Sequence, residues 1–552
     1  MEFIKKNKTL FLLILCAAYC LTLSVGHIAN IYIDVGREIY YPEAILEGKV
    51  LYKDLFCIYG PFSYLFNALL YKIFGAELST LYLAGSVCAL SIVSLIYLIS
   101  RKFLSNFISI VIAIFTIITG CLATRIFNFT LPYSYAVLYG LVCFLISLWF
   151  LISFLENKDE KKLILSSVFA GLSVINKYDF FLYFIPLTVV ILKTKNIKLI
   201  LKSYAGFFIT CIIPFIILFI QGITFADLFN TVKAIKDFTA TNAMTVFYKT
   251  QGVYYTNNVW MGWLNIISTY ILYLVFIIPG VFIFYKKNIF LKITGIVLVT
   301  AGILFGIFNI RQTDYLFLTF LTTVIFILRF KKNSYIENIL ISSIILISLK
   351  SVWGLSHVNY GLYYASSVLI SFFIILKNNL NKKLVHSICF VVIAGALSFL
   401  SINLSWIYNM NGEIITNKGK ILTVNDWGKV TGELIEYIDS IEEDNPFIVV
   451  LPEGLIVNFL TAKQHKTEGF YNSLIPLYTE GFGEDVIIEH YKKIMPDYFI
   501  ITNMSTGSYE KGEICNTYAQ RFCNFVLDNY IPIKRFEDDN AKIVVFYKGG
   551  EL

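Results

Sequence analysis

Residues 34–61 read DVGREIYYPEAILEGKVLYKDLFCIYGP, and this charged, tyrosine-rich stretch separates the first long apolar run of the chain from the second. It begins with Asp34, Arg37 and Glu38, whereas apolar side chains dominate the rest of residues 1–405. Ionisable groups at membrane depth are costly, so they usually mark a functional site or a tight polar contact. The stretch therefore predicts a polar site at the end of a membrane span.

The composition of the chain excludes an ordinary soluble protein. Of its 552 residues, 57% are hydrophobic, 17% are aromatic and only 15% are charged, whereas soluble domains average roughly 45–50% apolar and about 25% charged residues. The formal net charge of +8 needs no nucleic-acid partner, because most Lys and Arg residues form short clusters between apolar runs, as the positive-inside rule expects. We predict an α-helical polytopic membrane protein.

Thirteen apolar runs separated by basic or polar breaks predict about thirteen membrane spans. Basic clusters fall on alternate breaks, which predicts a cytoplasmic N-terminus and an extracytoplasmic C-terminal region. The predicted spans are Leu10–Ile31, Leu78–Ser100, Phe103–Leu122, Ser134–Leu155, Leu163–Ile175, Phe180–Leu192, Ser203–Ile220, Trp263–Phe284, Ile289–Phe308, Tyr315–Phe330, Ile336–Trp353, Tyr363–Leu376 and Leu384–Trp406.

The fifth and sixth spans are short for a bilayer, which needs roughly 20 residues per helix. One long span over residues 163–192 would fit that length better. It would, however, bury Lys177 and Asp179 at mid-bilayer and reverse every later loop. We therefore favour two shortened helices that meet at the sequence NKYD.

We predict two domains, a transmembrane unit over residues 1–406 and an α/β domain over residues 407–552. The first has outer loops at 32–77 and 221–262, and an amphipathic segment at 225–238 is expected to lie along the membrane interface. In the second, strands alternate with helices, and no glycine-rich phosphate loop occurs. Cys515 and Cys523 could pair outside the cell, but a helix between them would place them roughly 12 Å apart, too far to bridge.

The first loop holds the candidate proton acceptor. Asp34 and Glu38 are four residues apart and would share one face of a helix. A carboxylate at the boundary between water and membrane is well placed to accept a proton from an incoming hydroxyl. The alternative is a structural pair of Asp34 with Arg37 that caps the end of the first span. Lys53 and Asp54 add further charges to the loop.

Isolated cations stand at the predicted outer ends of distant spans. They are Arg125, Lys177, Arg311 and His357. Each one alone fits an interfacial cation whose side chain reaches for water. Together, if the spans converge around one outer cavity, they would suit an anionic phosphate.

Three motifs resemble a known family when they are taken with the acid after the first span. They are LYKDLFCIYGPFSYLFNALLYKIFG at 51–75, GLSVINKYDF at 171–180 and RQTDYLFL at 311–318. Over about residues 1–380 the chain resembles the multi-spanning glycosyltransferases of the C fold. The likeness is to the bacterial branch related to protein O-mannosyltransferases and to the aminoarabinose transferases of lipid A.

The resemblance implies a role for individual residues. Asp34 matches the first-loop carboxylate that serves as general base, with Glu38 as a second acid. Lys177 and Arg311 match cations that line the site of the lipid phosphate. Pro61 and Tyr64 would fall in a juxtamembrane helix that packs beside the cavity. The residues that would support the first loop are Arg37, Lys53, Asp54, Tyr59 and Tyr64. The chain departs from the family at LPYSYA (131–136), where many relatives carry an acid and Tyr133 stands here. The segment FYNSLIPLYTEGFGE (470–484) resembles extracytoplasmic domains that help to bind the acceptor.

The chemistry fits these residue types. A sugar on a polyprenyl phosphate has an anionic leaving group, so the site needs cations there and one carboxylate base for direct displacement with inversion. A retaining hydrolase would need two carboxylates about 5–5.5 Å apart. We therefore predict transfer of one sugar from a polyprenyl-phosphate donor to a glycan, lipid or protein acceptor on the outer face of the membrane.

Other functions and partners remain open from the sequence. A transporter or flippase of a lipid-linked glycan would need charged or broken helices near mid-bilayer, but most ionisable residues here lie at span ends. A receptor or scaffold would use the C-terminal domain and leave the spans unexplained. No cofactor is predicted, and no ligand cluster requires a metal ion, although first-loop carboxylates could bind a divalent cation. The abundance of Ile, Lys, Asn and Phe fits an AT-rich bacterial genome and favours undecaprenyl phosphate as carrier.

Overall fold

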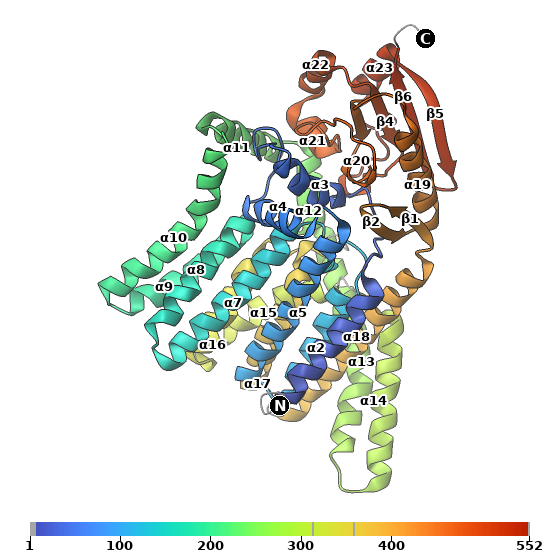
Figure 1. Cartoon of the computed structure of the whole chain (residues 1–552). Helices are drawn as coiled ribbons and strands as arrows, with labels where there is room; N and C mark the ends of the chain where they lie inside the picture. Colours follow the sequence, from blue (N-terminus) through green and yellow to red (C-terminus); the bar gives the residue numbers. More distant parts are fainter. Residues whose placement is uncertain (1–6, 312–313, 357–358, 550–552) are drawn as a thin grey trace.

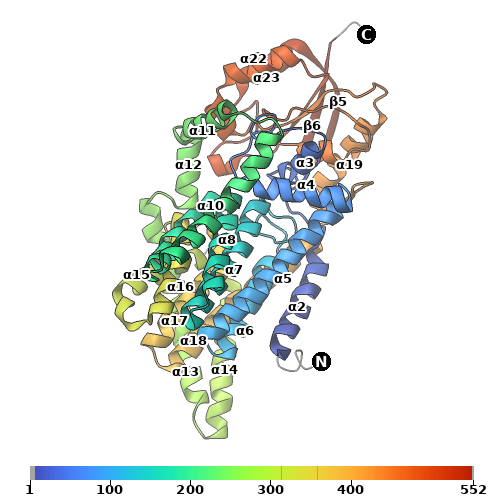
Figure 2. The same cartoon turned by 60° about the vertical axis from the view of Figure 1, so that its left-hand side comes forward.

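The computed structural model describes residues 7–311, 314–356 and 359–549. Figure 1 shows a bundle of long helices with a smaller domain of helices and strands at one end of it. The turned view in Figure 2 shows the same arrangement, with the smaller domain at one end of the helical bundle. The predicted fold class, a helical membrane protein with a small C-terminal α/β domain, is confirmed.

Each of the thirteen predicted apolar runs contains a helix. Seven helical segments in the described residues are long and apolar enough to cross a membrane, and α2 and α6 are shorter apolar helices. Whether the remaining predicted spans also cross the membrane, to give about thirteen in all, stays a prediction. The helices are α2 (Lys8–Ser24), α5 (Leu78–Phe103), α6 (Asn106–Thr116), α7 (Tyr135–Asn157), α8 (Glu160–Asn176), α9 (Phe184–Lys193), α10 (Ile197–Ile220), α13 (Asn257–Phe284), α14 (Ile289–Asn309), α15 (Asp314–Arg329), α16 (Tyr335–Ser348), α17 (Ala365–Asn379) and α18 (Lys382–Asn409).

The stretch from 163 to 192 forms two helices, as favoured above. α8 ends at Asn176, and a short 3₁₀ turn, η2 (Tyr178–Tyr183), leads into α9. Lys177 lies at this break with an extended backbone. The break places Lys177 and Asp179 at a helix end, where polar groups can reach a cavity.

The two long loops that are predicted to lie outside, residues 32–77 and 221–262, are folded. The first contains α3 (Val35–Leu46) and α4 (Phe62–Phe74). The second contains α11 (Phe225–Thr239), which starts with a capping box formed by Thr224 and Asp227, and α12 (Asn242–Gln251). Phe238 of α11 packs on the rings of Tyr478 and Phe482 in the C-terminal domain. Residues 225–238 thus form a helix, one end of which meets the C-terminal domain. Its position along the membrane interface stays a prediction.

The C-terminal domain follows α18, and the predicted division at residue 406 falls within the last turn of that helix. A hairpin comes first, followed by a four-stranded sheet in the order β3–β4–β6–β5, in which β3 and β4 are parallel and the other pairs antiparallel. Its elements are β1 (Gly412–Thr416), β2 (Gly419–Thr423), α19 (Asn425–Ser440), β3 (Ile448–Leu451), α20 (Leu455–Leu460), α21 (Pro476–Phe482), α22 (Glu484–Ile494), β4 (Tyr498–Thr502), α23 (Gln520–Asn529), β5 (Tyr530–Asp538) and β6 (Ala541–Lys548).

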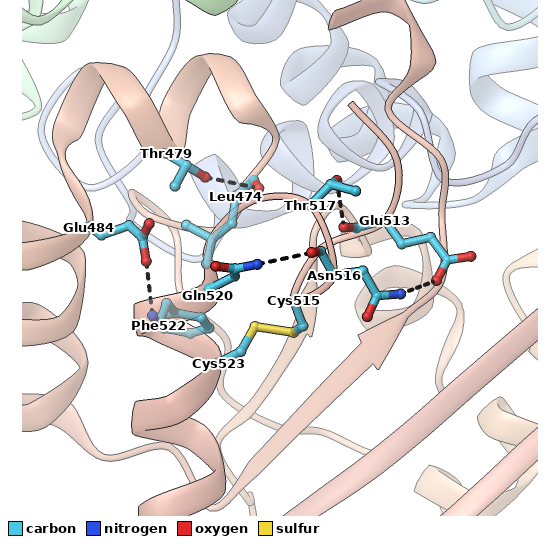
Figure 3. Close-up of a disulfide and its surroundings, with 10 residues drawn as sticks. All are labelled: Leu474, Thr479, Glu484, Glu513, Cys515, Asn516, Thr517, Gln520, Phe522 and Cys523. Carbon is cyan, nitrogen blue, oxygen red and sulfur yellow. Dashed lines mark hydrogen bonds between the residues drawn. A yellow bond between two sulfur atoms is a disulfide. The ribbon is translucent and has the colours of Figure 1, made fainter. Parts of the chain in front are cut away.

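Cys515 and Cys523 form a disulfide, with their Cα atoms 5.5 Å apart (Figure 3). The helix assumed between them is wrong for its first half, because α23 begins only at Gln520 and Cys515 adopts a positive φ in the preceding turn. The Gln520 amide donates to the Asn516 carbonyl at 3.0 Å, and the Glu484 carboxylate accepts from the Phe522 N–H at 3.0 Å. The turn therefore brings the sulfurs together.

Replacing both cysteines by serine is expected to loosen the loop before α23. The bond spans 8 residues, and constraining a loop of that length contributes about 2.5 kcal/mol in the chain-entropy model. We expect a lower thermal midpoint of the C-terminal domain and faster proteolysis at residues 503–518, measured on the detergent-purified protein. Cys16→Ser is the control, because Cys16 is a free, exposed thiol. Equal midpoints for the two variants would contradict the prediction.

The C-terminal domain is packed directly on the first loop. Tyr32 shares a hydrogen bond of 3.0 Å with Thr431 and stacks obliquely on Trp427. Further along, Asn472 donates to the Tyr41 hydroxyl at 3.1 Å. The contact is closest at Gly36, where an added Cβ would lie 2.5 Å from the backbone nitrogen of Ile456 in α20. The N-terminal end of α3 and α20 can approach this closely only because residue 36 is glycine.

Gly36→Ala is therefore expected to separate α3 from α20. Overpacking a tight contact costs about 1–3 kcal/mol, and here the obstructing atoms are backbone. Hydrogen–deuterium exchange should become faster in both helices. Gly432→Ala is the matched control, because the nearest atom to its added Cβ, the Glu413 carbonyl oxygen, is 4.0 Å away. Unchanged exchange in α3 and α20 of the Gly36 variant would show that the contact does not hold the domain.

Candidate active site

A cavity of about 750 Å³ lies between the helical bundle and the C-terminal domain. It is lined by the ends of several helices, by the first loop and by loops of the C-terminal domain. Among the residues predicted from the sequence, its lining includes Asp34, Arg37, Tyr59, Arg125 and Lys177. The structure therefore brings together first-loop and distant cationic side chains, as the predicted site requires.

Asp34 immediately precedes α3 and has φ of +62°. A non-glycine residue in this region costs of order 1–3 kcal/mol, and such residues cluster at functional sites. The Asp34 carboxylate accepts a hydrogen bond of 2.9 Å from the Arg37 guanidinium and keeps 20% of its side-chain surface exposed. The backbone thus turns a charged, partly accessible carboxylate toward the cavity.

Arg37 holds Asp34 in place. Its Nε donates to the Tyr64 hydroxyl at 3.1 Å, and its guanidinium lies 5.3 Å from the Tyr59 ring centre. Nε is also 3.6 Å from the Glu38 carboxylate. The guanidinium, whose pKa lies far above any working pH, therefore joins the two first-loop acids.

Glu38 is not part of the cavity lining. Its side chain has no exposed surface. One oxygen accepts from the Tyr64 hydroxyl at 2.6 Å and the other from the Tyr135 backbone N–H at 2.7 Å, at the start of α7. Because α3 begins only at Val35, Asp34 and Glu38 do not share a helical face as the spacing suggested. Glu38 instead ties α3 to α7.

Lys177 lies in an aromatic enclosure. Its ammonium nitrogen lies 5.0, 4.9 and 5.1 Å from the ring centres of Tyr59, Tyr133 and Tyr360, and it bonds the Tyr133 hydroxyl. Only 6% of its side chain is exposed. Burial and the neighbouring Lys350 lower the pKa of Lys177 to about 7. Aromatic faces stabilise a desolvated cation, and an anion bound beside Lys177 would favour its charged form. Tyr133 of the LPYSYA segment forms part of this enclosure.

A second lysine in the cavity went unrecognised in the sequence. Lys350 lies within the predicted span Ile336–Trp353, but α16 ends at Ser348, so this lysine reaches the cavity. Its ammonium donates to the Asp179 carboxylate at 2.5 Å, and the same carboxylate is 3.8 Å from Lys177. Two lysines thus face one aspartate. The sequence does carry one signal for this residue: Lys350 is a single lysine about one helical turn before the end of the apolar run 336–353.

The other predicted cations differ in position. Arg125 lines the cavity and lies 5.3 Å from the Trp406 ring centre. Arg311 is exposed and does not line the cavity. Its backbone N–H donates to the Asp314 carboxylate at 3.0 Å. His357 lies outside the described residues.

Two first-loop charges hold the loop rather than line the cavity. The Asp54 carboxylate accepts from the Val50 backbone N–H at 2.8 Å, and the exposed Lys53 donates to the Gly222 carbonyl at 3.4 Å. The C-terminal domain contributes cavity residues that sequence reasoning missed, among them Glu453, Tyr478 and Tyr509. In the sequence, Glu453 directly follows the apolar segment PFIVVLP (446–452), which is typical of a buried strand. That segment does not indicate which residues lie near Glu453 in space.

Residues 59–221 match the family described as dolichyl-phosphate-mannose-protein mannosyltransferase. Tyr59, Arg125, Tyr133 and Lys177, four residues of the cavity, fall within the matched segment. The match confirms the predicted resemblance over this part of the chain. Over that segment the chain is similar to mannosyltransferases that act on proteins with dolichyl-phosphate-mannose.

Two solved structures are similar over most of the chain. ArnT from Cupriavidus metallidurans bound to undecaprenyl phosphate is 11% identical, with 98% of each chain covered and a TM-score of 0.44. The oligosaccharyltransferase AglB from Archaeoglobus fulgidus, in complex with an inhibitory peptide and a dolichol-phosphate, is 11% identical, with 90% of this chain and 69% of AglB covered and a TM-score of 0.45. No curated protein matches the chain. Because both TM-scores are below 0.5, neither likeness bears on the activity.

Proposed function

We propose that the protein is an inverting glycosyltransferase that moves one sugar from a polyprenyl-phosphate donor to an acceptor on the outer face of the membrane. The observation that carries the proposal is the shared cavity, in which the Asp34 carboxylate and the Lys177 ammonium both form part of the lining. The family match over residues 59–221 supports a lipid-linked donor.

In this proposal the donor phosphate binds beside Lys177 and Lys350. The acceptor oxygen forms a bond to the anomeric carbon while the bond from that carbon to the phosphate oxygen breaks, and its electron pair stays on the phosphate. The leaving group is already an anion, so it needs cations rather than a proton. Asp34 takes the acceptor proton, and Arg37 keeps the carboxylate in position. Positioning and charge stabilisation would supply most of the rate enhancement.

The orientation in the membrane is part of the proposal. An N-terminus in the cytoplasm and a C-terminal domain outside agree with the alternation of basic clusters. The Cys515–Cys523 disulfide supports an oxidising compartment for the C-terminal domain. The cavity, which the C-terminal domain partly lines, would then open on the outer face.

Release of the carrier lipid tests the proposal. The purified protein in liposomes is supplied with undecaprenyl phosphate linked to mannose, glucose, galactose or aminoarabinose, together with a membrane extract as a source of acceptors. Mass spectrometry should detect free undecaprenyl phosphate and a product heavier by one sugar for at least one donor. Movement of an intact donor across the bilayer, without its consumption, would instead indicate a flippase and overturn the proposal.

A further inference from the structure

Glu453 is a carboxyl group of the C-terminal domain that the mechanism above does not use. It lies between the end of β3 and the start of α20 and lines the large cavity beside Asp34. Both residues, with Arg37, also line a small adjoining cavity of about 30 Å³. A space of that size can hold a water molecule. Two carboxyl groups from distant parts of the chain therefore meet at one polar corner of the site.

The structure holds Glu453 in this corner by several contacts. The Ser473 hydroxyl donates to its Oε1 at 3.1 Å, and the backbone N–H of Asp34 also bonds the carboxyl group. The close packing of Gly36 against Ile456 keeps α20, and with it Glu453, beside the start of α3. Arg37, which is already bound to Asp34, is the cation that acts on the charge of Glu453.

Electrostatics decides how the two groups are protonated. Burial raises the pKa of Glu453 to about 8, the charge of Asp34 adds to this effect, and Arg37 opposes it. Two adjacent carboxyl groups in a shielded site do not both ionise at neutral pH. Asp34 has the guanidinium as its partner, whereas the raised pKa of Glu453 favours its protonated form. The other groups that face Glu453 are the neutral side chains of Ser473, Tyr360, Tyr478, Tyr509 and Tyr518.

We propose that Glu453 is the second carboxyl group of the transferase site and that it forms with Asp34 a pair that holds one proton before transfer and two after it. This inference rests on the proposed function. As the acceptor oxygen bonds to the sugar and the phosphate leaves, the acceptor proton passes to Asp34 and makes the pair neutral. One proton then returns to water in the cavity. A protonated Glu453 keeps the pair at a single negative charge, which limits repulsion of the donor phosphate.

Infrared spectroscopy of the purified protein tests the pair without any substrate. The wild-type protein should show a protonated-carboxyl C=O band that disappears with a midpoint near pH 8 and is absent from Glu453→Gln. In Asp34→Asn, which removes the neighbouring carboxylate that raises the pKa of Glu453, the midpoint should fall. Thermal unfolding of each variant checks that it is folded.

The outcomes separate this inference from the proposed function. The pair is overturned if the wild-type protein has no band that titrates between pH 6 and 9, or if Asp34→Asn leaves the midpoint unchanged. If the band behaves as expected but no donor is consumed, the proposed function fails while the shared proton stands. If sugar transfer is observed, transfer by the wild-type protein should decline above about pH 8 as Glu453 ionises, and Glu453→Gln should lack this decline.

Discussion

Asp34→Asn is expected to reduce sugar transfer by a factor of roughly 100 to 10,000, the range that one general base contributes. The amide is nearly the same size as the carboxylate and can still accept the hydrogen bond from Arg37, so the cavity should keep its shape. It cannot take a proton from the acceptor. Turnover should fall, while binding of undecaprenyl phosphate should change by no more than a few-fold, because the proposed phosphate site is formed by Lys177 and Lys350.

The measurement is the release of undecaprenyl phosphate under single-turnover conditions, with binding of the same lipid measured separately. Asp159→Asn is the control. Asp159 also precedes a helix, where it accepts a hydrogen bond from the Lys161 backbone N–H, and asparagine caps helices about as well as aspartate. It is not part of the cavity lining. Transfer at the wild-type rate in the Asp34 variant would exclude Asp34 as the base.

The positions of the helices could be predicted from the sequence because the length of an apolar run directly reflects the membrane. Each of the thirteen runs contains a helix, and the break at Lys177 was placed correctly. Hydropathy does not locate the end of a helix to better than about one helical turn. The predicted span Ile336–Trp353 therefore includes Lys350, although α16 ends two residues before it.

The site was harder to predict because its geometry depends on the tertiary structure. The spacing of Asp34 and Glu38 predicts one helical face, but Asp34 has a positive φ and precedes the helix, and only Asp34 lines the cavity. Glu453 is more than four hundred residues away from Asp34 in the chain, and only the packing of α20 on Gly36 brings it to the cavity. The disulfide depended on a local turn that no hydrophobic pattern reveals.

Lys177→Met is expected to weaken the binding of undecaprenyl phosphate by roughly 10- to 100-fold, since one charge-assisted hydrogen bond contributes about 1.5–3 kcal/mol. Methionine is flexible and can fill the space between the three tyrosine rings without bringing a charge. Binding to the protein in nanodiscs can be followed by native mass spectrometry. Lys53→Met is the control, because Lys53 is an exposed first-loop cation that contacts the Gly222 carbonyl and does not line the cavity.

Lys350→Met should have a smaller effect than Lys177→Met. Lys350 is paired with Asp179 at 2.5 Å and keeps 33% of its side chain exposed, whereas Lys177 is 3.8 Å from the same carboxylate and almost fully enclosed by protein. Water and the carboxylate therefore screen Lys350 more strongly, and an anion gains less from it. The salt dependence of binding should also be steeper for the wild-type protein than for either variant. If Lys350→Met weakens binding more than Lys177→Met does, the phosphate lies against α16 and not in the tyrosine enclosure.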